Sequence, residues 1–259
     1  MQICVLLSCM HQKDISIVER SNIQTDAVIV NQCDQDKIEK FSFINKKGKE
    51  CHVKFIYTTE RGLSKSRNMA IRNCEADVCL LADDDECFSD DYEDIVLSAY
   101  KKRPDAGVIA FSLIRKDLKK GKFYPREEKK LGFKQIFSTT SVQLSFKRSN
   151  NIYFDEKMGS GTGNGGGEEN KFLFDVRRKK IAMWYNPSII ATINPGESTW
   201  FKGYNENFFK NHGWASRRSL GVCLSLLYCC YYVVKMRKRT NLHFLTLVTC
   251  EFHGWLTKK

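Results

Sequence analysis

The sequence predicts an α/β protein with a mixed, mostly parallel central sheet flanked by helices and a helical C-terminal appendage. Short apolar runs alternate with amphipathic stretches, which is the strand, helix, strand rhythm of a parallel sheet. One run ends abruptly in four acids, residues 83–86, and open α/β sheets bind ligands beyond the carboxyl ends of their strands. With 259 residues, the chain has room for one large domain and an appendage. We expect the α/β domain over residues 1–205 and a basic, partly apolar helical segment over residues 206–259.

The individual elements follow from local patterns. Continuous apolar runs predict buried strands at residues 3–7, 27–30, 53–57, 78–82 and 107–113. Helices are expected within residues 12–24, from an N-cap at Ser64 to about Cys74, and over residues 92–102. The Lys-rich stretch 116–134 has little periodicity and predicts a loop or hairpin, and the glycine-rich segment 159–167 leads into a further helix around Phe172.

The charge is concentrated near the C-terminus. The chain carries a formal charge of +12, and residues 200–259 hold ten Lys or Arg against Glu206 and Glu251. A basic surface suits nucleic acid, an anionic membrane or an acidic substrate, and a merely solvated surface is an equal alternative. Residues 220–234 contain no charge, but a membrane span needs about 20 such residues. A core helix and an interfacial helix remain the alternatives there.

Cysteine usage and the N-terminus predict a cytoplasmic protein. The eleven cysteines include no CxxC pair and no zinc-type spacing, so they are expected to be reduced and mostly buried. The first residues lack the basic region and cleavage site of a signal peptide. The basic C-terminal segment adds the alternative of peripheral attachment to the cytoplasmic face of the inner membrane.

The acidic cluster Asp83-Asp84-Asp85 is the first motif with a chemical meaning. Hard carboxylate oxygens on a tight turn can hold Mg²⁺ or Mn²⁺ and leave coordination positions for diphosphate oxygens. A solvated surface turn would have the same composition. The position directly after an apolar strand favours the metal site.

A second and a third motif flank that cluster in the sequence. Lys65 and Arg67 lie at a helix start, where free backbone N–H groups favour an anion, although no Walker-type loop is present. Glu168 and Glu169 follow three glycines at another helix start. Because adjacent helical residues point in different directions, we expect only one of these two acids to act as a base. The alternative is a pair of acids placed favourably at a helix N-terminus.

Taken together, the three motifs in this order resemble the family 2 glycosyltransferases of GT-A fold, of the bacterial surface-polysaccharide type. The resemblance covers roughly residues 3–200. It rests on the segments GLSKSRNMAI, ADVCLLADDDE and FDEKMGSGTGNGGGEENKFLFD. These are similar to the helix before the family's metal strand, its DxD motif and its acceptor-side acidic motif.

The resemblance implies a divalent metal, Mn²⁺ or Mg²⁺, at Asp85 and Asp83, with Asp84 assisting. Asp83 would also contact the ribose or nucleotide. The family's general base corresponds to Glu169, where the family usually has Asp, so Glu168 stays an alternative.

Further donor contacts are implied outside the acidic motifs. Arg67 and Lys65 would approach the donor diphosphate, and Asn31 and Asp34 the nucleobase. Many members place a histidine near the metal late in the domain, but IIATINPGESTWF has none and offers Thr192 and Asn194 instead.

The implied reaction is a metal-dependent single displacement with inversion at the anomeric carbon. The donor would be a nucleoside-diphosphate sugar, with a UDP-sugar favoured. The acceptor would be a hydroxyl of a saccharide or lipid-linked saccharide, in surface polysaccharide biosynthesis. The basic, apolar C-terminal segment suggests that this acceptor is membrane-bound.

Two other functions stay open. A sugar-nucleotide nucleotidyltransferase would also combine an α/β sheet, metal-binding acids and basic phosphate contacts, but its early Gly-rich, Lys-containing loop is missing. A non-catalytic nucleic-acid-binding module is supported only by the charge of +12 and by aromatic residues near the basic C-terminus. Since no nucleic-acid-binding motif is recognisable, no nucleic-acid partner is expected.

Overall fold

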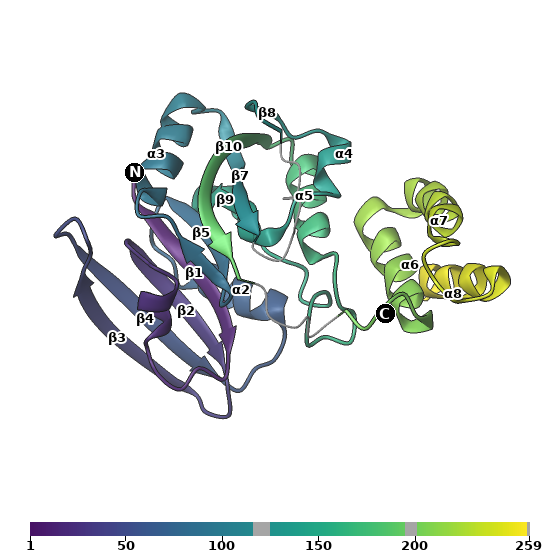
Figure 1. Ribbon diagram of the computed structural model, residues 1–259, viewed down its shortest axis with the longest axis horizontal. Coiled ribbons are helices and arrows are strands. Elements are labelled where there is room, and N and C mark those ends of the chain that lie inside the picture. Colours follow the sequence, from purple (N-terminus) through teal and green to yellow (C-terminus); the bar gives the residue numbers. More distant parts are fainter. Residues whose placement is uncertain (116–124, 195–200, 258–259) are drawn as a thin grey trace. The chain divides into compact units, whose positions relative to one another are not determined.

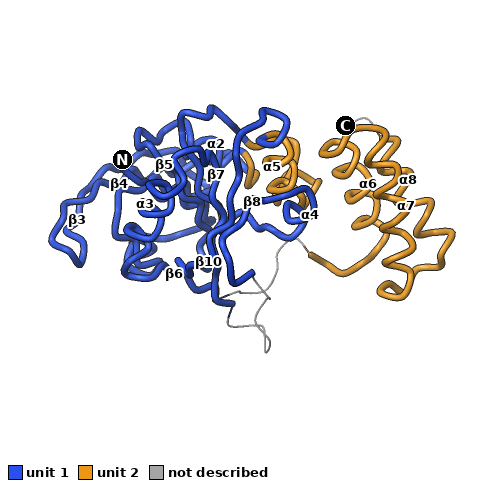
Figure 2. The backbone as a smooth tube through the Cα atoms, turned by 90° about the horizontal axis from the view of Figure 1, so that it is seen from above, with its two compact units in different colours: residues 1–61, 65–153, 176–196 blue, residues 62–64, 154–175, 197–259 orange. Residues whose placement is uncertain are grey.

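The computed structural model describes residues 1–115, 125–194 and 201–257, which form two compact units (Figures 1 and 2). Unit 1 comprises residues 1–61, 65–153 and 176–196, and unit 2 comprises residues 62–64, 154–175 and 197–259. The division of the chain into functional parts at residue 205 remains a prediction. Of the expected loop or hairpin at residues 116–134, the part 116–124 lies outside the described residues.

Unit 1 contains a mixed ten-stranded sheet (Figure 1). Its strand order is β3-β4-β2-β1-β5-β9-β7-β10-β6, with β8 beside β10. The pairings among β4, β2, β1 and β5 and between β7 and β10 are parallel, whereas β3, β9 and β6 run antiparallel to their neighbours. The strands are β1 (Ile3–Met10), β2 (Asp26–Gln32), β3 (Lys37–Ile44), β4 (Glu50–Thr58), β5 (Val78–Asp83), β6 (Glu86–Phe88), β7 (Ala106–Arg115), β8 (Lys129–Lys130), β9 (Leu144–Lys147) and β10 (Ala182–Ile193).

The core of unit 1 explains why the central strands are apolar throughout. Seven of the eight residues of β1 are buried, as expected where a parallel sheet is covered on both faces. The helices of this unit are α1 (Ile17–Arg20), most of α2 (Leu63–Arg72), α3 (Tyr92–Lys102) and α4 (Phe133–Ile136). Tyr92 and Val96 of α3 join strand residues such as Leu7 and Leu80 in one hydrophobic cluster. The predicted α/β sheet is therefore confirmed.

Some local predictions were wrong. Ser64 is not an N-cap, because it lies inside α2 and its hydroxyl donates a hydrogen bond to the carbonyl oxygen of Met158 at 2.7 Å. By contrast, the short helix expected within residues 12–24 is present, as the four residues of α1. Among the strands, β3 was not predicted; it pairs only with β4, at the edge of the sheet.

Unit 2 contains most of α5 (Glu168–Arg178) and three C-terminal helices, α6 (Glu206–Leu220), α7 (Val222–Met236) and α8 (Phe244–Leu256). The side chain of Asn205 caps α6 by accepting a hydrogen bond from the backbone N–H of Phe208 at 2.9 Å. Backbones of α6 and α8 meet closely, because a Cβ added to Gly254 would lie only 1.8 Å from the carbonyl oxygen of Lys210. No helix in the described ranges is both long and apolar enough to cross a membrane.

The cysteines are free thiols, and eight of the eleven are buried. Two that are exposed, Cys223 and Cys230, belong to α7. The expectation that most cysteines are buried is confirmed by these positions.

Candidate functional site

An acidic turn lies at the carboxyl end of β5. Asp83 is the last residue of the strand, Asp84 and Asp85 form the turn, and Glu86 begins β6. The backbone N–H of Asn194, just after β10, donates to the carbonyl oxygen of Asp85 at 2.9 Å. The turn is therefore held between two elements of the sheet, at the edge where α/β proteins bind ligands.

The acids of this turn repel one another in a partly buried setting. Burial, followed by the charge of Asp83, raises the pKa of Asp84. Burial and the charges of Asp83 and Asp84 raise the pKa of Asp85 to about 6. Burial, with smaller contributions from Asp83 and Asp85, also raises the pKa of Glu86, which is only 2% exposed. A cation at this turn would reduce the cost of keeping these groups charged.

Arg67 holds the first acid of the turn. Its side chain is 1% exposed, and its Nη2 atom donates to Oδ1 and Oδ2 of Asp83 at 3.0 and 3.2 Å. The same nitrogen donates to the hydroxyl of Ser141 at 2.8 Å. Because α2 carries this buried guanidinium to the end of β5, Arg67 fixes Asp83. Its predicted contact with a donor diphosphate remains a prediction.

Asn31 lies fully buried near the end of β2. Its amide nitrogen donates to the carbonyl oxygen of Gln12 at 2.9 Å, and its amide oxygen accepts from the N–H of Gln12 at 3.0 Å. The side chain of Gln12 in turn donates to Oδ2 of Asp84 at 3.3 Å. Asn31 therefore positions the segment that reaches the acidic turn. Its role in nucleobase recognition is still a prediction.

Two other predicted donor residues form ion pairs nearer the surface. The Asp34 carboxylate, 89% exposed, pairs with Arg61 at 2.7 Å. Arg61 also donates to the carbonyl oxygens of Cys33 and Thr59, at 2.9 and 2.8 Å, and so joins the ends of β2 and β4. Lys65, in the first turn of α2, pairs with Glu60 at 3.1 Å.

Glu168 and Glu169, the two candidates for the general base, begin α5 in unit 2. Glu168 is 6% exposed and Glu169 is half-buried. Gly166 and Gly167 precede them with φ of +88° and +84°, a conformation that glycine adopts without strain. Hydrogen bonds close the preceding loop, including one from the Thr162 hydroxyl to the carbonyl oxygen of Gly159 at 2.7 Å. The glycines thus build a defined turn into the helix.

The donor chemistry of the acidic turn fits a divalent cation. Within residues 1–115, 125–194 and 201–257, no group of three or more His, Cys, Asp or Glu side chains is arranged to hold a metal ion. Mg²⁺ is, however, commonly held by one or two carboxylates together with substrate phosphates. Asp83 and Asp85 could supply such oxygens, and the metal assignment remains a prediction.

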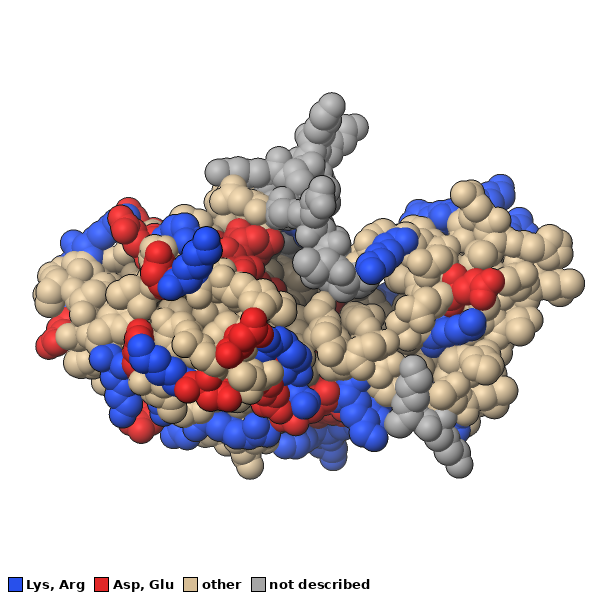
Figure 3. Space-filling model, turned by 90° about the horizontal axis from the view of Figure 1, so that it is seen from below, with Lys and Arg blue, Asp and Glu red and all other residues tan. Residues whose placement is uncertain are grey.

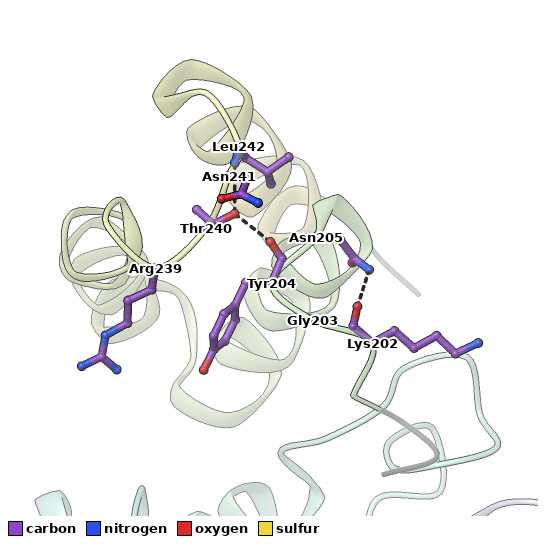
Figure 4. Close-up of a pocket in the computed structure, with 8 residues that line it drawn as sticks. All are labelled: Lys202, Gly203, Tyr204, Asn205, Arg239, Thr240, Asn241 and Leu242. Carbon is purple, nitrogen blue, oxygen red and sulfur yellow. Dashed lines mark hydrogen bonds between the residues drawn. The ribbon is translucent and has the colours of Figure 1, made fainter. Parts of the chain in front are cut away.

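A separate pocket of about 320 Å³ lies in unit 2 (Figure 4). Lys202 to Asn205 and Arg239 to Leu242 line it, and the Thr240 hydroxyl donates to the carbonyl oxygen of Tyr204 at 2.7 Å. None of the predicted site residues lines this pocket, so it carries no part of the predicted chemistry.

Sequence reasoning missed the residues that support the acidic turn. Ser141 is 74 residues away from Arg67 in the sequence, and Gln12 is 72 residues away from Asp84. Neither lies in a motif, so no local signal identifies them. Only the pairing of the strands brings them to the turn.

The comparisons with known proteins agree with this arrangement. The family model "Glycosyl transferase family 2" matches residues 15–166, which is more than half of the chain. A search of curated proteins found no match.

Among solved structures, the 1–349 fragment of S. aureus TarS is similar, with a TM-score of 0.57 and 13% identity over 98% of this chain and 71% of that chain. The same fragment in complex with UDP-GlcNAc has a TM-score of 0.58 and 14% identity, over 98% of this chain and 72% of that chain. A further structure of S. aureus TarS has a TM-score of 0.59 and 12% identity, over 92% of this chain and 44% of that chain. At such identities, these matches support the GT-A fold alone, whereas the family model matches the sequence itself. The chain therefore belongs to glycosyl transferase family 2.

Proposed function

We propose that this protein transfers a sugar from a nucleoside-diphosphate donor to an acceptor hydroxyl, with inversion at the anomeric carbon. The observation that carries the proposal is the acidic turn Asp83-Asp84-Asp85 at the carboxyl end of β5, with Arg67 bonded to Asp83. Membership of family 2 supports the glycosyl transfer. The structures of the TarS fragment with UDP-GlcNAc and with UDP support a UDP-sugar as the donor.

Each predicted residue has a defined task in this reaction. Asp83 and Asp85 would bind Mn²⁺ or Mg²⁺, and the metal would offset charge developing on the departing diphosphate. Arg67 keeps Asp83 in place, and Asn31 places Gln12 beside Asp84. Glu169 would accept the proton of the acceptor hydroxyl as general base, with Glu168 as the alternative.

The acceptor belongs to the same proposal. We infer a saccharide or lipid-linked saccharide, in surface polysaccharide biosynthesis at the cytoplasmic face of the membrane. The support is the basic C-terminal segment, with ten Lys or Arg against two Glu over residues 200–259. Transfer to lipid-linked saccharides extracted from membranes, compared with free oligosaccharides, tests this part.

The decisive experiment is calorimetry with a panel of UDP-, GDP- and TDP-sugars, with Mn²⁺ or with chelator. We expect one donor to bind in a metal-dependent way and its slow hydrolysis to release the nucleoside diphosphate. Asp85→Ala should abolish binding. Asp77→Ala is the matched control, because Asp77 lies just before β5, at the opposite end of the same strand.

A second pair of variants tests the base. Glu169→Gln should retain donor binding and lose transfer by roughly 100-fold or more, while Glu168→Gln should retain turnover. The reverse pattern would assign the base to Glu168. If no donor binds in the presence of metal, the proposed function is wrong.

A further inference from the structure

The helix α7 presents an apolar face to solvent. Leu224, Leu227, Tyr231 and Val234 are 53%, 69%, 58% and 58% exposed. Their spacing of three, four and three residues places them along one stripe of the helix. Val222 and Leu226 are also exposed, at 53% and 41%, but they lie outside this stripe, roughly 120–160° around the helix from its centre. We call Leu224, Leu227, Tyr231 and Val234 the α7 stripe.

The opposite side of α7 already has its packing partners within unit 2. Ser225, Cys229, Val233 and Met236 are buried, and Val233 and Met236 join Phe209 and Leu247 in a small hydrophobic cluster. The α7 stripe is therefore not needed for this packing. A contiguous exposed apolar surface of this kind marks an interaction site.

Positive charge is concentrated at the C-terminal end of the stripe. Lys235, Arg237, Lys238 and Arg239 are all exposed, and the Lys235 ammonium lies 5.6 Å from the ring centre of Tyr231.

The acids of this region do not offset that charge. Glu206 pairs with Lys210 at 3.4 Å, and the fully buried Glu251 pairs with His212 at 2.7 Å. Figure 3 shows a mainly uncharged surface over the C-terminal helices, with several Lys and Arg side chains and little acidic surface.

We propose that the α7 stripe docks onto the surface of an anionic membrane, with the basic residues 235–239 at the lipid phosphates. At 1.5 Å per residue, a 15-residue helix is about 22 Å long, which is shorter than the hydrocarbon core. The helix therefore lies along the interface, where apolar side chains enter the acyl boundary and Tyr231 sits at headgroup level. Each basic residue adds attraction to anionic lipid.

Charge complementarity favours this occupant over a second copy of the chain. A second copy would bring the same basic end and the same excess of positive charge to the contact. An anionic bilayer offers both an apolar layer and negative charge, and so matches both parts of the surface. The proposal deepens the placement at the membrane in the proposed function, and the sugar transfer itself is tested separately by donor calorimetry.

Cosedimentation of the full chain with vesicles tests the proposal. We expect binding to phosphatidylcholine vesicles that contain phosphatidylglycerol, and much weaker binding to phosphatidylcholine alone or in high salt. Leu224→Ser with Leu227→Ser should lower the affinity by roughly tenfold per leucine, since each exposed leucine contributes burial in the bilayer. Arg237→Glu with Lys238→Glu should remove the preference for phosphatidylglycerol.

The matched control is Ile38→Ser with Ile44→Ser on β3, whose side chains are exposed to a similar degree, 57% and 66%. This variant should bind vesicles like the wild type. Circular dichroism and thermal unfolding verify that every variant is folded. Calorimetry with the nucleotide-sugar donor shows whether a variant that binds vesicles weakly still binds the donor. Equal vesicle binding by the leucine variant and the wild type would overturn the proposal. So would a wild-type dimer that binds no vesicles and becomes monomeric in the leucine variant.

Discussion

The bond between Arg67 and Asp83 predicts that Arg67→Met destabilises the fold. Removing one partner of a buried ion pair costs about 3–5 kcal/mol. Asp83 is 31% exposed, so water can partly solvate the carboxylate left behind. We therefore expect a loss of about 2–3 kcal/mol in the free energy of unfolding, or roughly 5–10 °C in Tm for a domain of this size.

Lys65→Met is the matched comparison on the same helix. Lys65 and its partner Glu60 are 37% and 43% exposed, and their ion pair spans 3.1 Å. Exposed pairs contribute about 0–1 kcal/mol, so this variant should unfold almost as the wild type does.

Urea unfolding of both variants measures the difference between the two pairs. A double-mutant cycle with Asp83→Asn isolates the coupling, which should exceed about 1 kcal/mol. If Arg67→Met unfolds within about 0.5 kcal/mol of the wild type, the reasoning from burial is refuted.

Three other predictions follow from the charges and the backbone. Burial tends to raise the pKa of Asp155, but hydrogen bonds from Arg218 and Lys157 outweigh it and lower that pKa. The ion pair should therefore stabilise the fold fully above the ordinary Asp pKa of about 3.9. The loss in free energy of unfolding caused by Arg218→Ala, measured in urea, should shrink as the pH falls below that value. A loss that does not change with pH would contradict this. Asp85→Asn should raise the Tm in chelator, because it removes a charge that is partly buried and is repelled by Asp83 and Asp84. The variant should also lose any gain in Tm from Mn²⁺. A lower Tm in chelator would contradict this reasoning. Gly254→Ala should cost about 2 kcal/mol or more, because its Cβ would meet the Lys210 carbonyl at 1.8 Å; Gly163→Ala, with open space around it, should cost about 1 kcal/mol, and equal losses would contradict the close contact.

Elements with strong patterns could be predicted from the sequence. The helix α3 has the predicted ends, because Tyr92, Val96 and Ala99 recur on one buried face. The strand β5 was found as an apolar run because it is buried along its length. Edge strands give a weaker signal: every residue of β3 is at least partly exposed, so the strand contains no continuous apolar run.

The candidate site divides in the same way. Asp83 to Asp85 could be found because the acids interrupt the apolar pattern directly after β5. The contacts of Arg67 with Ser141 and of Asn31 with Gln12 could not, because both depend on strand order. Sequence spacing carries no information about which loops meet at the end of a sheet.

The exposed edge strand β3 has a consequence for solubility. An unpaired edge offers backbone N–H and C=O groups to a strand of another molecule. Exposed apolar side chains such as Ile38 and Ile44 would stabilise that intermolecular pairing. Lys37 and Lys40 place positive charge on the same strand, and charged edges discourage aggregation between molecules. These lysines lower the local preference for strand, but they disfavour pairing of the sheet with the sheet of another molecule. Anyone engineering this fold for higher strand propensity at β3 would be removing a safeguard against fibril-like assembly.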